Sequence, residues 1–411
     1  MRTTTPIKTA GQDIRDVDAL IYNPEKFDDV RHTPLSAKLP IRNVKNTKYE
    51  RFEEVNFDFS GTCGAAAYGA TSLTLNTSFA ATVQAGSVLF FPRDGERVKV
   101  TAINRTTGVA TVIRNFGAEI TGDGGTAAEG DGTAITASDP VVLAGIGFPE
   151  GTTSPESDSM TPQSSYNYVQ IFKRGLESSE TQEALAKYGE ANSFEYRFKK
   201  TIAEYKRLKE QAFWFGVRRT GTVDGKTELY TGGILQCLKA NHTTVADGIL
   251  SPAVFDAFSI KVHENGSDEK DLFMSPSAYA AILKSGRIPL QTGPKDSVLG
   301  IEIKQIIAAA GKFNIYVLPK ILFGNDNINT GKYIFALDMQ SNTIKRAVFR
   351  ATQVKNMSGD ERVDGRYGHL VSEEGIDMFG YGLDNDYAES TGAQRGIHGL
   401  LVCTSASGWS A

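Results

Sequence analysis

The clearest pattern of apolar and polar residues lies in the middle of the chain. Between residues 192 and 215 apolar side chains recur every three or four positions, which is the repeat of one helical face. Asn192 followed by Glu195 is a capping arrangement, and Glu195 with Lys199 is a favourable i,i+4 pair. We expect a long helix with Phe194, Phe198, Ile202, Tyr205, Leu208, Ala212 and Phe215 on its buried face, and Arg197, Lys199, Lys200, Glu204, Lys206, Arg207 and Glu210 on its solvent face.

Residues 57–150, before this helix, follow a different period. Segments 72–76 and 97–101 alternate between apolar and polar residues, and 109–113 is rich in β-branched side chains. This period of two indicates strands, and the turn residues between them indicate hairpins. We expect a compact all-β module, closed by the Ser/Thr/Pro-rich connector 151–165.

After residue 216 helix and strand patterns alternate. Ser251-Pro252 and Ser275-Pro276 are helix starts, each an N-cap followed by proline at the first helical position. Ser179 with Gln182 predicts a further short helix that ends at Gly189. The predicted later helices span 252–263 and 278–284, and the predicted strands span 271–274, 313–318, 332–338, 344–354 and 370–378.

The first 55 residues are polar and are interrupted by Pro6, Pro24, Pro34 and Pro40. Proline fixes φ and removes a backbone donor, so this segment is either an extended arm with a few short elements or a disordered tail. The N-terminus lacks the apolar run of a signal peptide, and no apolar stretch is long enough for a transmembrane helix.

Composition is that of an ordinary globular protein: 411 residues, 40% hydrophobic and 22% charged. A formal net charge of −4 argues against an electrostatic nucleic-acid binder. Cys63, Cys237 and Cys403 lie far apart, so neither a disulfide framework nor a zinc ribbon is expected. Their number and spacing fit assembly in a reducing cytoplasm.

Candidate chemistry is sparse. Segment 221–227, GTVDGKT, resembles a phosphate-binding loop, but it has three residues between its glycines where four are needed, and it follows a helix. We interpret it as an exposed turn. His369 with Glu373 and Glu374 could be proposed as a set of metal ligands. In a strand, however, side chains alternate faces, and we interpret these three residues as ordinary polar side chains on the surface.

The remaining signals also favour structure over catalysis. Adjacent carboxylates such as Glu53-Glu54 diverge, and neither a nucleophile elbow nor a calcium loop occurs. The aromatic stripe on the long helix is typical of core, and the mild basic excess on its other face is typical of a solvated surface. We therefore predict no catalytic, cofactor-binding or metal-binding residue, no cofactor, and no enzymatic activity.

The order of parts resembles one family, the tailed-bacteriophage major capsid proteins of the Hong Kong 97-like fold. Their chains likewise run from an arm through an extended loop and a spine helix into peripheral and axial domains. The resemblance covers about 165–400, while the arm and β module match in position only. The segments that carry it are 167–172 and 176–182 before the spine helix, 195–214 within it, 231–234 after it, and 274–277, 311–319, 335–338, 372–375 and 398–400 further on.

The resemblance implies an α+β Hong Kong 97-like capsid fold. It also implies a major capsid protein that self-assembles into pentamers and hexamers, forming an icosahedral or prolate head around double-stranded DNA. Scaffolding, portal and decoration proteins are the implied partners, without sequence-specific DNA binding or a membrane, in a virion assembled in the host cytoplasm. The implied domains are an arm (1–56), a β-rich extended-loop domain (57–165), the spine helix with the peripheral domain (166–245), an axial domain (246–330), and peripheral return strands with the C-terminus (331–411).

Three other classes stay open at this point. An encapsulin-like nanocompartment shell shares the same fold and differs in its cargo. A β-rich phage or bacterial adhesin would account for residues 57–150 but not for the later α/β segment. An enzyme in that segment would need a clustered polar pocket that the spacing of residues does not reveal.

Overall fold

A computed structural model of the chain describes most of it in two compact units. The first comprises Met1–Tyr49, Tyr166–Leu383 and Gly396–Ala411, and the second Glu50–Ser165 and Asp384–Arg395. The five-part domain division expected above stays a prediction. The described residues are 33–53, 59–117, 132–151, 162–179, 181, 193–238, 241–284, 290–291, 297–298, 301–302, 304–318, 329–340, 343–356, 365–378 and 396–405.

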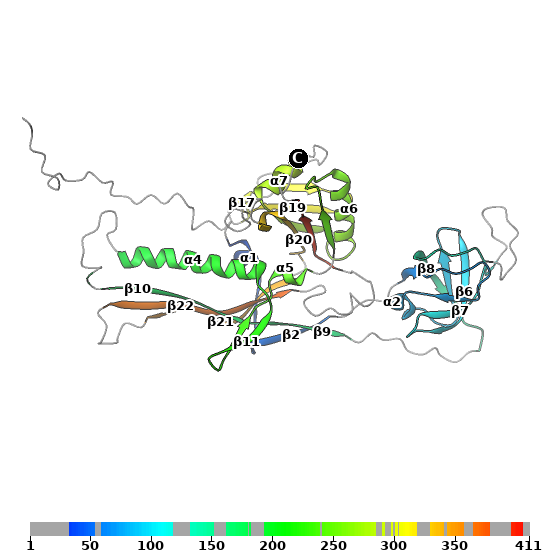
Figure 1. Cartoon of the computed structure of the whole chain (residues 1–411), viewed down its shortest axis with the longest axis horizontal. Coiled ribbons are helices and arrows are strands. Elements are labelled where there is room, and N and C mark those ends of the chain that lie inside the picture. Colours follow the sequence, from blue (N-terminus) through cyan, green and yellow to red (C-terminus); the bar gives the residue numbers. More distant parts are fainter. Residues whose placement is uncertain are drawn as a thin grey trace, which may run out of the picture. The chain divides into compact units, whose positions relative to one another are not determined.

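A four-stranded sheet with a long helix along it forms one part of the first unit (Figure 1). Its two longest strands, β21 (Ile344–Asn356) and β22 (Arg366–Met378), are antiparallel. At one edge the short β1 (Ile41–Asn43) pairs parallel with β21, and at the other β10 (Gln170–Ser178) pairs antiparallel with β22. The predicted strands 344–354 and 370–378 are therefore confirmed.

The long helix α4 spans Ser193–Phe215, as its periodicity predicts. Phe213, Trp214 and Tyr205 lie in the largest hydrophobic cluster, with Phe198, Ile202, Ala212 and Phe215 packed against it. The expected Glu195–Lys199 pair forms, with Nζ and Oε1 3.2 Å apart. The predicted helix 179–189 lies almost entirely outside the described residues.

Two positions on α4 correct the predicted division of its faces. Leu208, predicted to be buried, is 45% exposed, and Glu210, predicted to face solvent, is fully buried. The reason is that α4 is covered on two sides. Tyr205 reaches Phe172 and Ser372 of the four-stranded sheet, whereas Trp214 packs on Phe273 of the other sheet. A single stripe of apolar residues cannot describe a helix that packs between two partners.

A seven-stranded mixed sheet forms the other part of the first unit. Its central strand β14 pairs parallel with β19 and antiparallel with β20. Helices α6 (Pro252–His263) and α7 (Pro276–Lys284) begin where the Ser-Pro steps predict, and the side chain of Ser251 accepts from the Val254 amide. The strand order is β13 (His242–Val245), β23 (Gly399–Cys403), β20 (Tyr333–Leu337), β14 (Glu269–Met274), β19 (Lys312–Val317), β18 (Lys304–Ile307) and β15 (Leu290–Gln291).

The second unit is the expected β module, with its own core of small and branched residues such as Leu89, Val98 and Val112. Its antiparallel sheet contains strands in the two alternating segments, 72–76 and 97–101, and in the β-branched segment 109–113. A short helix, α2 (Thr77–Ala80), is capped by Asn76, whose side chain accepts from the Ser78 amide. The strand order is β3 (Ser60–Cys63), β8 (Asp139–Ile146), β5 (Ser87–Phe91), β6 (Glu96–Asn104), β7 (Val109–Ile113) and β4 (Ser72–Thr74).

Short elements complete the described chain. Helix α1 (Pro34–Lys38) precedes β1, and α5 (Ile234–Cys237) follows an exposed hairpin. The two-stranded sheets are β2 (Lys48–Glu53) with β9 (Gln163–Tyr168), β11 (Arg219–Val223) with β12 (Lys226–Tyr230), and β16 (Ser297–Val298) with β17 (Ile301–Glu302), and one 3-10 helix, η2, spans Asn329–Lys332.

Candidate functional site

The most elaborate polar site joins the end of the predicted arm to the rest of the first unit. Helix α1 lies against α4, where the buried carboxylate of Glu210 accepts from the backbone amides of Leu35 (2.7 Å) and Ser36 (3.0 Å). The Ser36 hydroxyl (2.8 Å) and the indole N–H of Trp214 (3.2 Å) also donate to it. The first amides of a helix have no partner within the helix, so Glu210 caps α1 from a distant part of the chain.

Two further charged contacts hold α1 from other elements. The Lys38 ammonium forms an ion pair with Asp271 of β14 and donates to the Tyr316 hydroxyl at 2.8 Å. From β21, Arg346 Nη1 donates to the Ser36 carbonyl at 3.2 Å. We call this set of side chains, Glu210, Asp271, Tyr316 and Arg346, the arm seat.

A second buried polar cluster links α4 to the long strands. Lys209 Nζ lies 2.9 Å from Glu374 Oε1, with both side chains almost completely buried. Burial lowers the pKa of Lys209 although Glu374 opposes this shift. Next to Glu374 on β22, Glu373 forms an ion pair with Arg350 of the neighbouring strand β21. We expected Glu373 and Glu374 to be polar side chains on the surface. For Glu374 this is wrong, because its side chain is buried and pairs with Lys209 of α4.

His369 lies on the same strand as Glu373 and Glu374. His369 is paired in register with Gly175 and Lys355, several residues along β22 from Glu374. Among the described residues no group of three or more His, Cys, Asp or Glu side chains could hold a metal ion. All three cysteines lie among the described residues; they are buried and form no disulfide.

Segment 221–227 forms the turn of the exposed β11–β12 hairpin. Thr222 pairs with Thr227 and Val223 with Lys226, which leaves Asp224 and Gly225 as a two-residue loop. Both have positive φ, 50° and 74°, as a tight hairpin turn requires. The backbone amides are thus engaged in a hairpin and do not open a helix.

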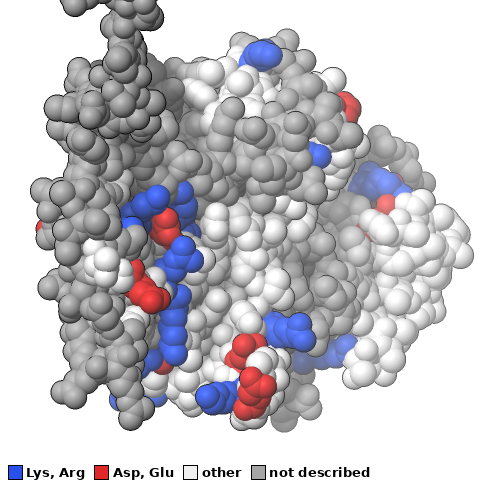
Figure 2. Space-filling model, turned by 60° about the vertical axis from the view of Figure 1, so that its left-hand side comes forward, with Lys and Arg blue, Asp and Glu red and all other residues white. Residues whose placement is uncertain are grey.

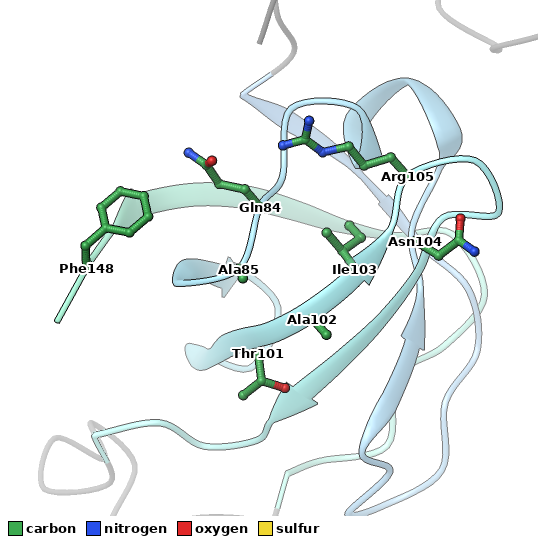
Figure 3. A pocket seen from close by; sticks show the side chains of 8 residues that line it. All are labelled: Gln84, Ala85, Thr101, Ala102, Ile103, Asn104, Arg105 and Phe148. Carbon is green, nitrogen blue, oxygen red and sulfur yellow. The ribbon is translucent and has the colours of Figure 1, made fainter. Parts of the chain in front are cut away.

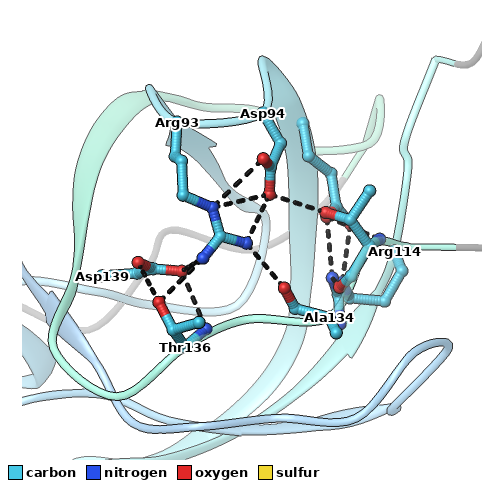
Figure 4. Close-up of polar contacts among 8 residues, drawn as sticks. Arg93, Asp94, Arg114, Ala134, Thr136 and Asp139 are labelled. Carbon is cyan, nitrogen blue, oxygen red and sulfur yellow. Dashed lines mark hydrogen bonds and ion pairs between the residues drawn. The ribbon is translucent and has the colours of Figure 1, made fainter.

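The second unit has a dense polar network between β6, β7 and the segment before β8 (Figure 4). The buried guanidinium of Arg114 forms a bidentate ion pair with the buried carboxylate of Glu96. Its Nε lies 2.6 Å from Oε1, and its Nη2 lies 2.7 Å from Oε2. Nearby, Arg93 lies between Asp94 (2.7 Å) and Asp139 (2.6 Å). Hydrogen bonding to Thr136, and then the nearby Arg93 charge, lower the pKa of Asp139 despite partial desolvation. Each charge has a protein partner, so the network ties loops together.

An open hollow of about 710 Å³ lies on the same unit (Figure 3). Ala85, Ala102 and Ile103 are among the residues that line it, and Phe148 stands at one end with 48% of its surface exposed. Arg105 at the rim donates from Nε to the Val83 carbonyl. The hollow lacks converging acid–base side chains and has the character of a surface for contacts.

Surface charge is mixed. Figure 2 displays a face on which Lys and Arg side chains form a row with Asp and Glu among them. Arg174 of β10, for example, pairs with Glu204 of α4 at 2.8 Å. No helix in the described part of the chain has the length and apolar character needed to cross a bilayer.

Comparison with known proteins places these features in context. The family model of the SU10 major capsid protein matches residues 15–377. A major capsid protein of Pseudomonas phage PaMx41 is 24% identical over 344 residues, covering 79% of this chain and 76% of the relative.

Three solved structures are also similar at low identity. The capsid of a native GTA particle has a TM-score of 0.47 at 9% identity, covering 98% of each chain. Microbacterium phage Oxtober96 has a TM-score of 0.45 at 10% identity, covering 95% of this chain and 96% of the other. The SrpI encapsulin of Synechococcus elongatus has a TM-score of 0.39 at 14% identity, covering 59% and 75%.

The spine helix, the loop module and the family match together define a major capsid protein of a tailed phage, a component of the virion that forms the shell of its head. The chain belongs to the SU10 major capsid protein family. The expected mixture of helices and strands and the expected structural role are confirmed. Self-assembly into a shell follows from this role.

The arm seat is what the sequence analysis missed. Glu210 reads as one more polar residue of an amphipathic helix, and its partners Leu35 and Ser36 lie about 175 positions earlier. The available signal was the pair Thr33-Pro34, a typical helix start with proline at the first position, within a segment otherwise interpreted as extended.

Proposed function

We propose that the chain assembles into pentamers and hexamers, which close into an icosahedral or prolate head around double-stranded phage DNA. The observation that carries this proposal is the match to the SU10 major capsid protein family over residues 15–377. The exposed apolar side chains on strands and loops, among them Ile41 (58%), Phe59 (66%) and Ile171 (50%), support it, because such residues are suited to contacts between copies.

We also propose roles for the parts of the chain. The arm (1–56) and the loop domain (57–165) contact neighbouring subunits, and the axial domain (246–330) lies near the centre of each capsomer. The compactness of the second unit supports an independent loop domain. The later strands β20 and β23 belong to the same sheet as β14, so the return segment 331–411 contributes to that body as well.

The proposed partners are further copies of the chain, together with scaffolding, portal and decoration proteins. DNA is enclosed without sequence-specific binding, and a net charge of −4 supports enclosure over tight adhesion. We propose no catalytic, cofactor-binding or metal-binding residues and no enzymatic activity. Three buried cysteines that form no disulfide support assembly in a reducing host cytoplasm.

Electron microscopy and sedimentation of the full chain, expressed alone and together with a scaffolding protein, test this proposal. We expect closed shells, or rings of five and six subunits, in at least one of the two preparations. Nuclease treatment of heads isolated from infected cells then distinguishes enclosed DNA from another cargo. A chain that stays monomeric in both preparations, or closed heads that contain folded enzymes in place of DNA, would contradict it.

A further inference from the structure

The arm seat has the composition of a binding site for a short peptide segment. Three of the four hydrogen bonds to Glu210 come from the segment Pro34–Lys38, through two backbone amides and one hydroxyl. Lys38 and the Ser36 carbonyl are bound by Asp271 and Arg346, which come from two other elements. Leu35 of the same segment is completely buried in the largest hydrophobic cluster, so polar and apolar contacts together hold the segment in place.

Charge balance at the seat is unusual. Glu210 is completely buried, and its four donors are all neutral: two amides, a hydroxyl and an indole. A buried carboxylate with only neutral donors keeps much of its desolvation penalty, which protonation removes. Burial raises the pKa of Glu210 to about 7, although the hydrogen bonds from Leu35, Ser36 and Trp214 oppose the shift.

The other charged and titratable groups at the seat are bonded to different partners. Lys38 of α1 pairs with Asp271 of β14, and the Tyr316 hydroxyl of β19 accepts from the same ammonium. Arg346 of β21 binds the Ser36 carbonyl and lies 3.7 Å from Glu374 of β22, whose other oxygen is 2.9 Å from Lys209 of α4. Glu210 is thus the group in the seat that lacks an ionic partner among the described residues.

We propose that the arm seat binds Pro34–Lys38 reversibly and that binding takes up one proton at Glu210. In the bound state the proton lies on Oε2, and the Ser36 hydroxyl at 2.8 Å reverses its role: it turns its own hydrogen away and accepts the hydrogen bond from the carboxyl. When the segment leaves, the carboxyl reaches water and ionises. The proposal concerns the single chain and does not depend on shell assembly.

The direction of the pH effect follows from linkage. The carboxyl has a higher pKa with the segment bound than with the segment released, where water restores the ordinary glutamate pKa of about 4.3. Between these two values the bound state holds one more proton. The binding equilibrium therefore weakens by up to about tenfold per pH unit as the pH rises from about 5 to about 7, and is constant above that.

Hydrogen exchange at the Leu35 and Ser36 amides tests the proposal on the full chain. We expect the protection factors of these amides, corrected for intrinsic exchange, to fall at least about tenfold from about pH 5 to about pH 7.5. Glu210→Gln removes the titrating group and should abolish this change. The matched control Asp271→Asn should lower protection at every pH and keep the pH dependence, because it weakens the seat without touching Glu210.

A difference titration keeps the test decisive if glutamine fits the seat poorly. In the full chain one group, Glu210, should titrate near pH 7. In the chain lacking residues 1–40 the same carboxyl should titrate in the ordinary range of glutamate. Protection that is flat or rises with pH in the native chain, or a difference titration without this group, would overturn the proposal.

Discussion

Trp214 of α4 and Phe273 of β14 pack edge to face, with ring centroids 5.3 Å apart and planes inclined at 63°. The same indole lies 5.0 Å from the ring of Phe335 on β20. All three rings are completely buried. This cluster packs the spine helix against the seven-stranded sheet. On the other side, the Tyr205 hydroxyl of the helix bonds to Phe172 and Ser372 of the four-stranded sheet.

Trp214→Ala should be among the most destabilising substitutions in the first unit. It removes the largest fully buried side chain and one donor to Glu210, so we expect a loss of about 3–5 kcal/mol in the free energy of unfolding. Urea unfolding followed by circular dichroism measures it. Leu208→Ala on the same helix, where the side chain is 45% exposed, should cost less than about 1 kcal/mol. Equal losses would contradict the two-sided packing of α4.

The Arg114–Glu96 pair predicts a non-additive pair of substitutions in the second unit. Arg114→Met leaves the buried Glu96 carboxylate without its cation and should cost about 3–5 kcal/mol. Replacing both residues, Arg114→Met with Glu96→Leu, should cost less than Arg114→Met alone, because no uncompensated charge stays buried. Hydrogen-exchange protection of the amides in β5 and β6 measures the stability of this unit. A double variant less stable than the single one would show that the pair is a net source of stability.

Lys270 predicts a rise of stability with pH. Its ammonium is completely buried and donates to the carbonyls of Val262 and Asn265 (both 2.7 Å) and Ile397 (2.6 Å). Burial lowers its pKa from 10.5 to about 8. Between these values the unfolded chain binds more protons than the folded one, so folding becomes more favourable as the pH rises.

Comparison with Lys270→Met isolates this effect from other titrating groups. The free energy of unfolding of the native chain, relative to the variant, should increase from about pH 8 to about pH 10 by up to about 3 kcal/mol. Urea unfolding at several pH values measures the difference. A relative stability that stays constant, or falls, over this range would mean that folding does not lower the pKa of Lys270.

Two glycines of the second unit form a matched pair. Gly95 and Gly108 both have a φ of +71°, but a Cβ at Gly95 would meet nothing within 4 Å, whereas one at Gly108 would overlap the Leu75 carbonyl oxygen. Gly95→Ala should therefore cost about 1 kcal/mol, from backbone strain alone. Gly108→Ala should cost clearly more, since the β7 turn must also move away from Leu75. Thermal unfolding of both variants compares the two losses of stability, and equal losses would contradict the prediction.

Local signals in the sequence predicted the elements well. The Ser251-Pro252 step marks the start of α6 because a cap acts within one turn, and the alternation at 97–101 marks β6 because neighbouring side chains point to opposite faces. The burial of Glu210 and Glu374 could not be predicted in the same way. Their partners are brought to them by tertiary packing, and a helical or strand period carries no information about which distant segment covers a given position.

The buried cysteines give the chain a practical chemical property. Burial raises the pKa of Cys63 to about 11, and Cys237 and Cys403 are also shielded, so the native thiols should resist alkylation. Asp224→Cys, at the tip of the exposed β11–β12 hairpin, would then carry the fastest-reacting thiol of the folded protein. A fluorophore or gold cluster attached there would mark one defined point per subunit and so allow the hairpin to be located directly in images of assembled heads.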